Sequence, residues 1–363
     1  MTLIDTTIRR IHPIPLALDD AIKRHINDLT KPVGSLGQLE EAGFRYARIR
    51  QQVIPDMPVK RLYTFAADHG VVEEGVSAFP GEVTKQMVSN MVNGGAAINV
   101  FGRHVGCDVR IVDIGVNGDL SEIGGLIHRK IRHGTGNMVS GPAMHPDEML
   151  AALQVGVELA DEAAQDGVTL MGTGEMGIGN TTASAALMHV LLPCALDGII
   201  GRGTGIDDAG LQRKRTAIAA AVKRHGLTTN KGDEDPLKTL STVGGLEIAG
   251  LAGLILGSAA HRIAILIDGF ISSAAALVAC RLCPSIADYL FFSHLSAERG
   301  HRTFLKEMGA KPLLDLGFRL GEGTGAALSM SLIDAAVKMM REMATFSSAG
   351  VSGEVNSVDE GAA

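Results

Sequence analysis

Two carboxylates in this sequence lie between glycines, where little side-chain bulk would shield them from a ligand. Glu175 lies within Gly172-Thr-Gly-Glu-Met-Gly177, and Glu322 lies within Gly321-Glu-Gly-Thr-Gly325. Glu322 opens a long helical pattern, so the helix dipole should keep its carboxylate ionised and able to accept a proton. An acid in the first turn can also simply stabilise its helix, and spacing alone leaves both interpretations open.

The segment around Glu175 matches the G-x-G-x-x-G pattern of dinucleotide-binding loops, and Asp197 follows at a fitting distance. Two features argue against that function: the motif lies in the middle of the chain, and the charge of Glu175 would repel a pyrophosphate. Asn180-Thr-Thr182 offers a helix N-cap, so the helix start could bind a single phosphate. We therefore favour a monophosphate site or a simple tight turn over a dinucleotide site.

A second glycine-rich stretch could also hold an anion. Gly201-Arg-Gly-Thr-Gly205 is followed by the basic run Arg213-Lys-Arg215. Glycine amides beside a cation can bind phosphate, although a basic run on an exposed helix face gives the same pattern.

Two other clusters invite a metal or redox interpretation. Asp68-His-Gly-Val-Val-Glu-Glu-Gly75 contains ligand-type residues but lacks the spacing of common zinc sites, which favours a turn and an acidic loop. Cys280 and Cys283 close an apolar helical run just before Pro284, whereas a reactive C-x-x-C should open a helix. We predict neither a metal nor a cofactor.

Short apolar runs that end in Gly, Asp or His alternate with helical patterns. The expected strands are Leu62–Ala67, Val109–Ile114, Val168–Met171 and Ile263–Ile267, and the expected helices include Val83–Arg103, Pro146–Gln165, Asp207–His225 and Leu246–Ala260. This alternation is typical of an α/β fold with a parallel sheet and helices on both faces. Ligands bind such folds beyond the carboxyl ends of the strands, where most of the glycine-rich motifs would lie.

The two ends of the chain differ from its centre. Residues 1–60 look helical, with a break at Lys31-Pro-Val-Gly-Ser-Leu-Gly37, and should form part of a small domain. Residues 61–320 should form the large domain with the active site. A helix over 321–346 could join the small domain, and residues 347–363 are predicted to be a disordered tail.

Composition excludes several classes of function. The net charge is −7 and no long basic stretch is present, which argues against nucleic-acid binding. No charge-free apolar run reaches the length of a membrane span, and Met1–Arg10 lacks the pattern of a signal peptide. The four cysteines suit a reducing compartment, so we expect a cytoplasmic protein. With 45 glycines and 4% aromatic residues, small residues must provide much of the packing.

Taken together, the motifs resemble those of the nicotinate-nucleotide–dimethylbenzimidazole phosphoribosyltransferase family, which makes the lower-ligand nucleotide of cobalamin. The similarity spans nearly the whole chain, and the matching segments are Lys31-Pro-Val-Gly-Ser-Leu-Gly-Gln-Leu-Glu40, Ala67-Asp-His-Gly70, Gly134-Thr-Gly-Asn137, Gly172-Thr-Gly-Glu-Met-Gly-Ile-Gly-Asn-Thr-Thr182, Asp268-Gly-Phe270, Ser293-His-Leu-Ser-Ala-Glu298 and Gly321-Glu-Gly-Thr-Gly-Ala-Ala-Leu328. Ordered matches of this kind are far more specific than any single glycine motif.

The resemblance implies a Rossmann-like large domain, a small helical domain built from segments outside the sheet, and a homodimer. It implies that Glu322 is the general base and that Glu175 is a second carboxylate in the active site. The residues that it places around the ribose phosphate are Gly177, Asn180, Thr181, Gly203 and Lys214. The base pocket that it implies draws on Ser77, Phe79, Met87, Met176 and Leu320. Some family members carry polar residues in place of Phe79 and Met87, and the apolar pair here should suit a methylated benzimidazole.

The implied reaction moves a phosphoribosyl group from nicotinate mononucleotide to 5,6-dimethylbenzimidazole. Its transition state should be oxocarbenium-like, so a carboxylate such as Glu175 would stabilise the developing positive charge. Glu322 would take the proton that the attacking base must lose. The alternatives are a phosphate- or dinucleotide-binding module without catalysis and an NAD-dependent oxidoreductase.

Overall fold

A computed structural model of the protein describes residues 2–229 and 233–352. Its centre is a six-stranded sheet in the order β3-β2-β1-β4-β5-β6, and every strand pair is parallel. The strands are β1 (Lys60–Ala67), β2 (Asp108–Gly115), β3 (Ile127–His128), β4 (Leu170–Met176), β5 (Ala264–Ile267) and β6 (Leu290–Phe292). The predicted α/β fold with a parallel sheet is thereby confirmed. The strands β3 and β6 were not predicted, because they are too short to carry a pattern.

The strand β4 differs from its prediction, because it continues through the glycines to Met176. Gly172 and Gly174 are therefore strand residues and do not form a phosphate-binding turn. A Cβ at Gly172 would collide with Leu62, and one at Gly174 would collide with the backbone carbonyl of Glu322. These glycines let other parts of the chain approach the strand closely. The spacing that resembles a dinucleotide fingerprint therefore serves close packing and not phosphate binding.

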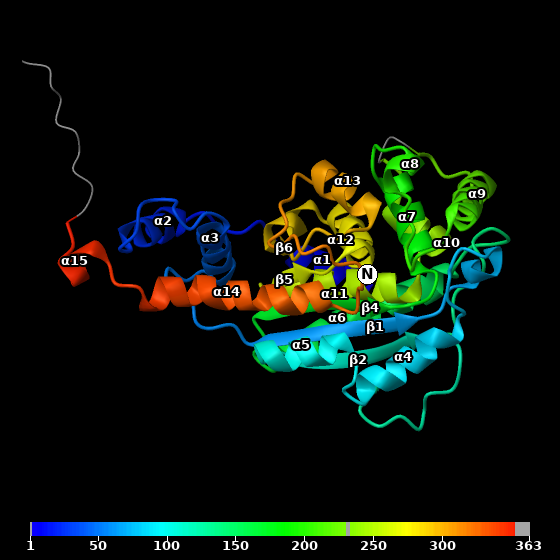
Figure 1. Ribbon diagram of the computed structural model, residues 1–363, viewed down its shortest axis with the longest axis horizontal. Coiled ribbons are helices and arrows are strands. Elements are labelled where there is room, and N and C mark those ends of the chain that lie inside the picture. Colours follow the sequence, from blue (N-terminus) through cyan, green and yellow to red (C-terminus); the bar gives the residue numbers. More distant parts are fainter. Residues whose placement is uncertain (1, 230–232, 353–363) are drawn as a thin grey trace, which may run out of the picture. The chain divides into compact units, whose positions relative to one another are not determined.

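Helices cover both faces of the sheet, as predicted (Figure 1). On one face, α11 (Leu246–Ala260) lies over β1 and β2, with its Gly250 against Phe65 and Ile114. On the other face, Val109 contacts Gly102 of α5 (Ala97–Val105), and Leu62 contacts Gly323 at the start of α14 (Thr324–Glu342). Glycines also bring α11 and α6 (Pro146–Gln165) together, because Gly156 and Gly253 each lie against the backbone of the other helix.

The other helices of the larger unit precede, connect or follow the strands. They are α1 (Leu3–Arg10), η1 (Gly70–Glu74), α4 (Glu82–Val92), α5 (Ala97–Val105), α7 (Asn180–Leu191), α8 (Leu196–Ile199), α9 (Asp208–Arg224), α10 (Pro236–Val243), α12 (Phe270–Leu282), η2 (Pro284–Tyr289) and α13 (Arg299–Glu307). The single helix predicted over Val83–Arg103 is in fact α4 followed by α5. Gly94 breaks it, because its φ of +77° lies in the left-handed region that a continuing helix cannot use.

The chain divides into two compact units. The larger unit comprises Met1–Ile14 and Pro58–Ser331, and the smaller unit comprises Pro15–Met57 and the described residues from Leu332 onward. The predicted boundary at residue 60 is therefore wrong for the first residues: α1 packs against α6 and α11, with Ile4 buried. The amphipathic pattern of α1 shows that it needs a partner but does not show which one.

The smaller unit is helical. It contains α2 (Asp19–Asp28), α3 (Gln38–Arg50), the second half of α14 and α15 (Phe346–Ala349). Its buried core consists of Ile22, Ile26, Leu29, Ala47, Met339 and Met340. The helix α15 corrects the predicted tail, since Thr345 caps it by accepting the backbone N–H of Ser348. The part of the predicted tail from residue 353 onward lies outside the described residues.

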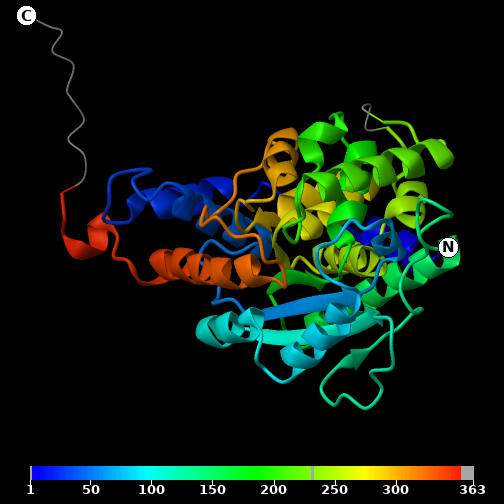
Figure 2. The same ribbon diagram turned by 45° about the vertical axis from the view of Figure 1, so that its right-hand side comes forward.

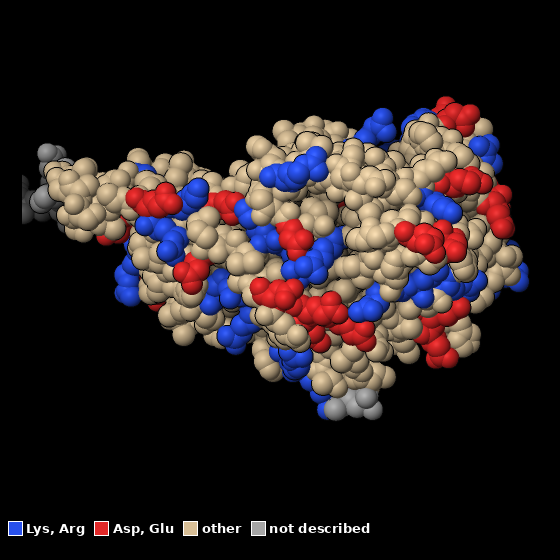
Figure 3. All heavy atoms as spheres, turned by 90° about the horizontal axis from the view of Figure 1, so that it is seen from below, with Lys and Arg blue, Asp and Glu red and all other residues tan. Residues whose placement is uncertain are grey.

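One face of the molecule illustrates how its charged side chains are distributed. On the face shown in Figure 3, acidic and basic side chains are interspersed and do not form a single basic patch. Among the helices of the described residues, none combines the length and the apolar character that crossing a membrane requires.

Candidate active site

A pocket of about 320 Å³ opens at the carboxyl ends of the central strands, within the larger unit. Its lining residues are Phe79, Val83, Met87, Glu175, Met176, Gly177, Ile178, Asn180, Thr181, Gly203, Thr204, Gly269, Phe270, Ile271, His294, Ser296, Glu298, Arg319, Leu320, Gly321 and Glu322. The structure thus brings together all of the candidate site residues except Lys214 and Ser77. Figure 2 shows the loops that follow the strands from a second direction.

The two exceptions lie directly behind the lining. The Lys214 ammonium donates to the Thr181 hydroxyl at 2.9 Å and to the Gly201 carbonyl at 3.2 Å. The Ser77 hydroxyl lies 3.4 Å from that of Thr204. The Ser77 hydroxyl also accepts the backbone N–H of Phe79 at 3.2 Å, and the Lys214 ammonium also lies close to Gly203, so both residues contact the wall of the pocket from behind.

Glu175 lies at the end of β4 with its side chain buried. The Asn180 side-chain amide donates to its Oε2 at 2.5 Å. Burial raises the pKa of Glu175 to about 8, and the nearby carboxylates of Asp268 and Glu247 add to the effect. This raised pKa favours the neutral form of Glu175 at neutral pH, whereas the resemblance to the family implied a carboxylate.

Glu322 is held in an uncommon backbone conformation. Its φ is +63°, and the neighbouring Gly321 and Gly323 have φ values of +89° and +95°. The Thr64 hydroxyl donates to the Glu322 carbonyl at 2.9 Å, and the Glu322 N–H donates to the Glu175 carbonyl at 3.2 Å. A non-glycine residue in the left-handed region costs about 1–2 kcal/mol, which these contacts must offset.

The titration of Glu322 differs from the prediction based on the helix dipole. Its carboxyl is buried, and burial raises its pKa above the ordinary value, while the backbone N–H of Ile98 acts in the opposite direction. Its Oε2 has no hydrogen-bond partner within the described part of the chain. A raised pKa makes the carboxylate a stronger base, and the unpartnered oxygen can accept a proton.

The other end of the pocket has the features of an anion site. Lys214 is buried, which lowers the pKa of its ammonium to about 8. The Gly203 N–H donates to both oxygens of Glu298, at 3.1 and 3.2 Å. At the start of α7, the residue in the N-cap position is Gly179, without a side-chain cap. The predicted cap is therefore wrong, because the Asn180 side chain bonds Glu175 and leaves backbone N–H groups of α7 uncapped.

Several pocket residues were not predicted as site residues. His294, Ser296 and Glu298 come from one segment after β6, and Gly269 and Phe270 follow β5. These residues lie in segments that match the family, which was the signal that could have identified them. Without recognition of β6, the pattern did not show that this segment ends at the same sheet edge.

The remaining motifs have structural partners. His69 bonds Glu247 at 2.7 Å in the interior. No cluster of three or more His, Cys, Asp or Glu side chains within residues 2–229 and 233–352 is placed to hold a metal ion. Cys280 and Cys283 are free thiols at the end of α12, and burial raises the pKa of Cys280 to about 12, which disfavours the reactive thiolate.

A parallel α/β sheet with two buried carboxylates and a lysine at its carboxyl edge is the arrangement of an enzyme that acts on a phosphorylated substrate. The family described as phosphoribosyltransferase matches residues 11–351, and the chain belongs to this family.

Similar proteins are more specific in name. A nicotinate-nucleotide–dimethylbenzimidazole phosphoribosyltransferase from Pelodictyon phaeoclathratiforme is 54% identical over 94% of this chain and 96% of its own length. The protein of the same name from Geobacter metallireducens is 52% identical over 97% of this chain and 98% of its own length. The crystal structure of CobT from Thermus thermophilus superimposes with a TM-score of 0.87 at 45% identity, covering 92% of this chain and 99% of that one.

Proposed function

We propose that this protein transfers the 5-phosphoribosyl group of nicotinate mononucleotide to 5,6-dimethylbenzimidazole, giving alpha-ribazole 5′-phosphate and nicotinate. The observation that carries the proposal is the placement of two buried carboxylates, Glu175 and Glu322, in one pocket between an apolar wall and a lysine. The names of the similar proteins support the same reaction.

The apolar wall suits the acceptor base. Phe79, Val83, Met87, Met176 and Leu320 line this part of the pocket, and Phe79 and Leu320 remain about half exposed. A methylated benzimidazole presents flat apolar faces and two ring nitrogens, so it would gain from burial against these side chains. Ser77 would act on the same region through Thr204.

The polar end suits the ribose phosphate. Gly177, Asn180 and Thr181 surround the start of α7, which has no side-chain cap and whose helix dipole attracts an anion. Lys214 and Gly203 both lie close to the Thr181 side chain. A 5′-phosphate held there would place the anomeric carbon toward the two carboxylates, which supplies the orientation that catalysis needs.

The chemistry then follows in one exchange of bonds. One benzimidazole nitrogen attacks the anomeric carbon, and the bond from that carbon to the nicotinate nitrogen breaks with its electron pair going to nicotinate. The acceptor becomes cationic and loses its N–H proton to Glu322, which acts as general base. A positive charge that develops on the ribose favours the ionised form of Glu175, which in turn stabilises that charge.

The test is an assay of nicotinate release with and without dimethylbenzimidazole. Release that depends on the base, with equal formation of alpha-ribazole phosphate, supports the transferase. Release without the base would indicate a hydrolase. Binding of nicotinate mononucleotide without turnover would favour a binding module, and hydride transfer with NAD would favour an oxidoreductase.

We also propose that the protein acts as a homodimer in the cytoplasm. The dimer rests on the family resemblance, and the compartment rests on the four cysteines of the sequence, which suit a reducing environment. Light scattering on the purified protein tests the dimer: a mass of one chain at micromolar concentration would contradict it.

A further inference from the structure

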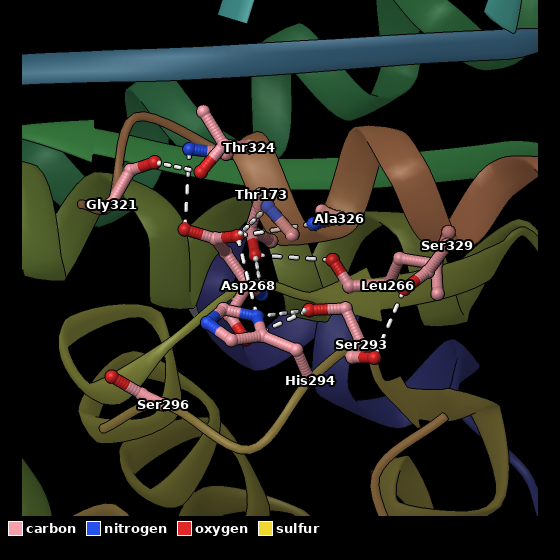
Figure 4. Close-up of polar contacts among 12 residues, drawn as sticks. Thr173, Leu266, Asp268, Ser293, His294, Ser296, Gly321, Thr324, Ala326 and Ser329 are labelled. Carbon is pink, nitrogen blue, oxygen red and sulfur yellow. Dashed lines mark hydrogen bonds and ion pairs between the residues drawn. The ribbon is translucent and has the colours of Figure 1, made fainter. Parts of the chain in front are cut away.

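The buried Asp268 follows β5 and binds a segment far away in the sequence (Figure 4). Its Oδ1 accepts the backbone N–H groups of Gly325 at 2.8 Å and Ala326 at 3.0 Å. Its Oδ2 accepts the N–H of Gly323 at 3.2 Å. One carboxylate from a neighbouring strand thus satisfies the free N–H groups at the start of α14, which normally need a capping side chain.

The three N–H groups begin immediately after Glu322. Since Glu322 and both flanking glycines have positive φ values, this turn does not hold its shape by backbone preference alone. Gly321 and Gly323 can adopt many other conformations. The turn must therefore be fixed by contacts from outside, and Asp268 provides more of them than any other described side chain.

Asp268 is itself held from behind. Its N–H donates to the Thr173 hydroxyl at 3.1 Å, and its carbonyl accepts the Ser293 hydroxyl at 2.9 Å. Because Ser293 has already donated its only hydroxyl proton, Nδ1 of His294 must be the donor in the 3.1 Å contact between them. The His294 ring in turn lies against Gly325 and lines the pocket.

We propose that Asp268 is the positioning residue of the active site: it holds the turn that presents the Glu322 carboxylate to the acceptor base. Its neighbour Gly269 lines the pocket and Asp268 does not, so it acts through Glu322 and not on the substrate. This inference rests on the proposed transferase function, in which Glu322 is the base.

The test is Asp268→Asn, which keeps shape and volume but has one acceptor oxygen in place of two. Either the N–H of Gly323 or those of Gly325 and Ala326 must then face an NH₂ group. We expect kcat to fall at least about tenfold, while KM for nicotinate mononucleotide stays within about twofold, because the phosphate end is untouched. The double variant Asp268→Asn, Glu322→Gln should be no slower than Glu322→Gln alone within about threefold, since one residue acts through the other.

Asp113→Asn is the matched control. Asp113 is equally buried in β2, which β1 and β4 separate from β5, and it accepts the Val116 N–H at 2.9 Å, away from the pocket. It should lose stability without the selective loss of kcat. Ser293→Ala removes the hydroxyl that donates to the Asp268 carbonyl, so it should give the same selective loss of kcat in weaker form. This second variant tests the inference even if Asp268→Asn does not fold.

Normal kcat in a folded Asp268→Asn variant would overturn the inference. So would losses that multiply in the double variant, or an unfolded Asp268→Asn variant together with normal kcat for Ser293→Ala. Failure of the proposed function is distinct from all of these, because the unmodified protein and Asp113→Asn would then both lack transferase turnover.

Discussion

At the scale of single residues, the site depends on ionisable groups whose surroundings change their behaviour. Glu175, Glu322 and Lys214 are all buried, and in each case burial favours the neutral form. Sequence could supply the identity of these residues through the resemblance to the family. It could not supply their pKa values, because burial depends on segments that are distant in the chain, such as those of Asp268 and Glu247.

Glu175 should make stability depend on pH. The unfolded chain releases this proton near the ordinary pKa of 4.5 and the folded chain near 8, so the folded state holds more protons between these values. Its stabilising contribution is complete below the lower value and is lost as pH rises through the higher one. As the pH rises from about 5 to about 9, the melting temperature of Glu175→Gln should therefore fall less than that of the unmodified protein.

Thermal melting across that range checks this. Glu148→Gln is a control, because hydrogen bonds lower the pKa of Glu148 and its removal should leave the alkaline loss in place. Parallel stability profiles for Glu175→Gln and the unmodified protein would show that Glu175 titrates normally.

Lys214 should recognise the phosphate. Its ammonium is the buried cation nearest to Thr181 and Gly203, so Lys214→Ala should weaken nicotinate mononucleotide at least about tenfold and nicotinate riboside much less. Arg215→Ala is the control, since Arg215 pairs with the exposed Asp197. Calorimetric titration with both ligands measures the difference, and equal weakening of both would remove Lys214 from this role.

At the scale of elements, the glycines of strand β4 position the site, because they carry no side chain. Gly174 allows the Glu322 carbonyl and the Thr64 hydroxyl to approach the strand, which sets the distance between Glu175 and Glu322. The sequence pattern showed the glycines but suggested a loop, because the same spacing serves a phosphate turn in other folds. The close approach arises from a turn almost 150 residues later, which local patterns cannot show.

Gly174→Ala should therefore disturb the Glu322 turn. Its methyl group would meet backbone, which cannot move aside as a flexible side chain can, so we expect turnover to fall at least about tenfold. Gly124→Ala is the control, because open space surrounds that position. Steady-state kinetics on both variants checks this, and unchanged turnover in Gly174→Ala would mean that the strand does not set the geometry.

At the scale of the whole molecule, the alternation of apolar runs and helical patterns predicted the parallel sheet and the edge at which ligands bind. It did not show that Met1–Ile14 packs with the sheet, or that β6 brings His294 and Glu298 to the pocket. Both depend on which surfaces meet in three dimensions. The matching motifs around Glu175, Asp268, His294 and Glu322, although dispersed along the chain, meet at one sheet edge, which is why the resemblance could point to one pocket.

The central claim is that Glu322 is the base that takes the proton of the acceptor, and Glu322→Gln tests it most directly. Gln preserves the shape of the side chain but cannot accept a proton in this way, so turnover with nicotinate mononucleotide and dimethylbenzimidazole should fall at least about a hundredfold while the fold survives. Glu148→Gln, at another first-turn acid remote from the pocket, should keep normal turnover. Near-normal turnover in a purified, folded Glu322→Gln variant would contradict the account and leave Glu322 as an acid that only stabilises its helix.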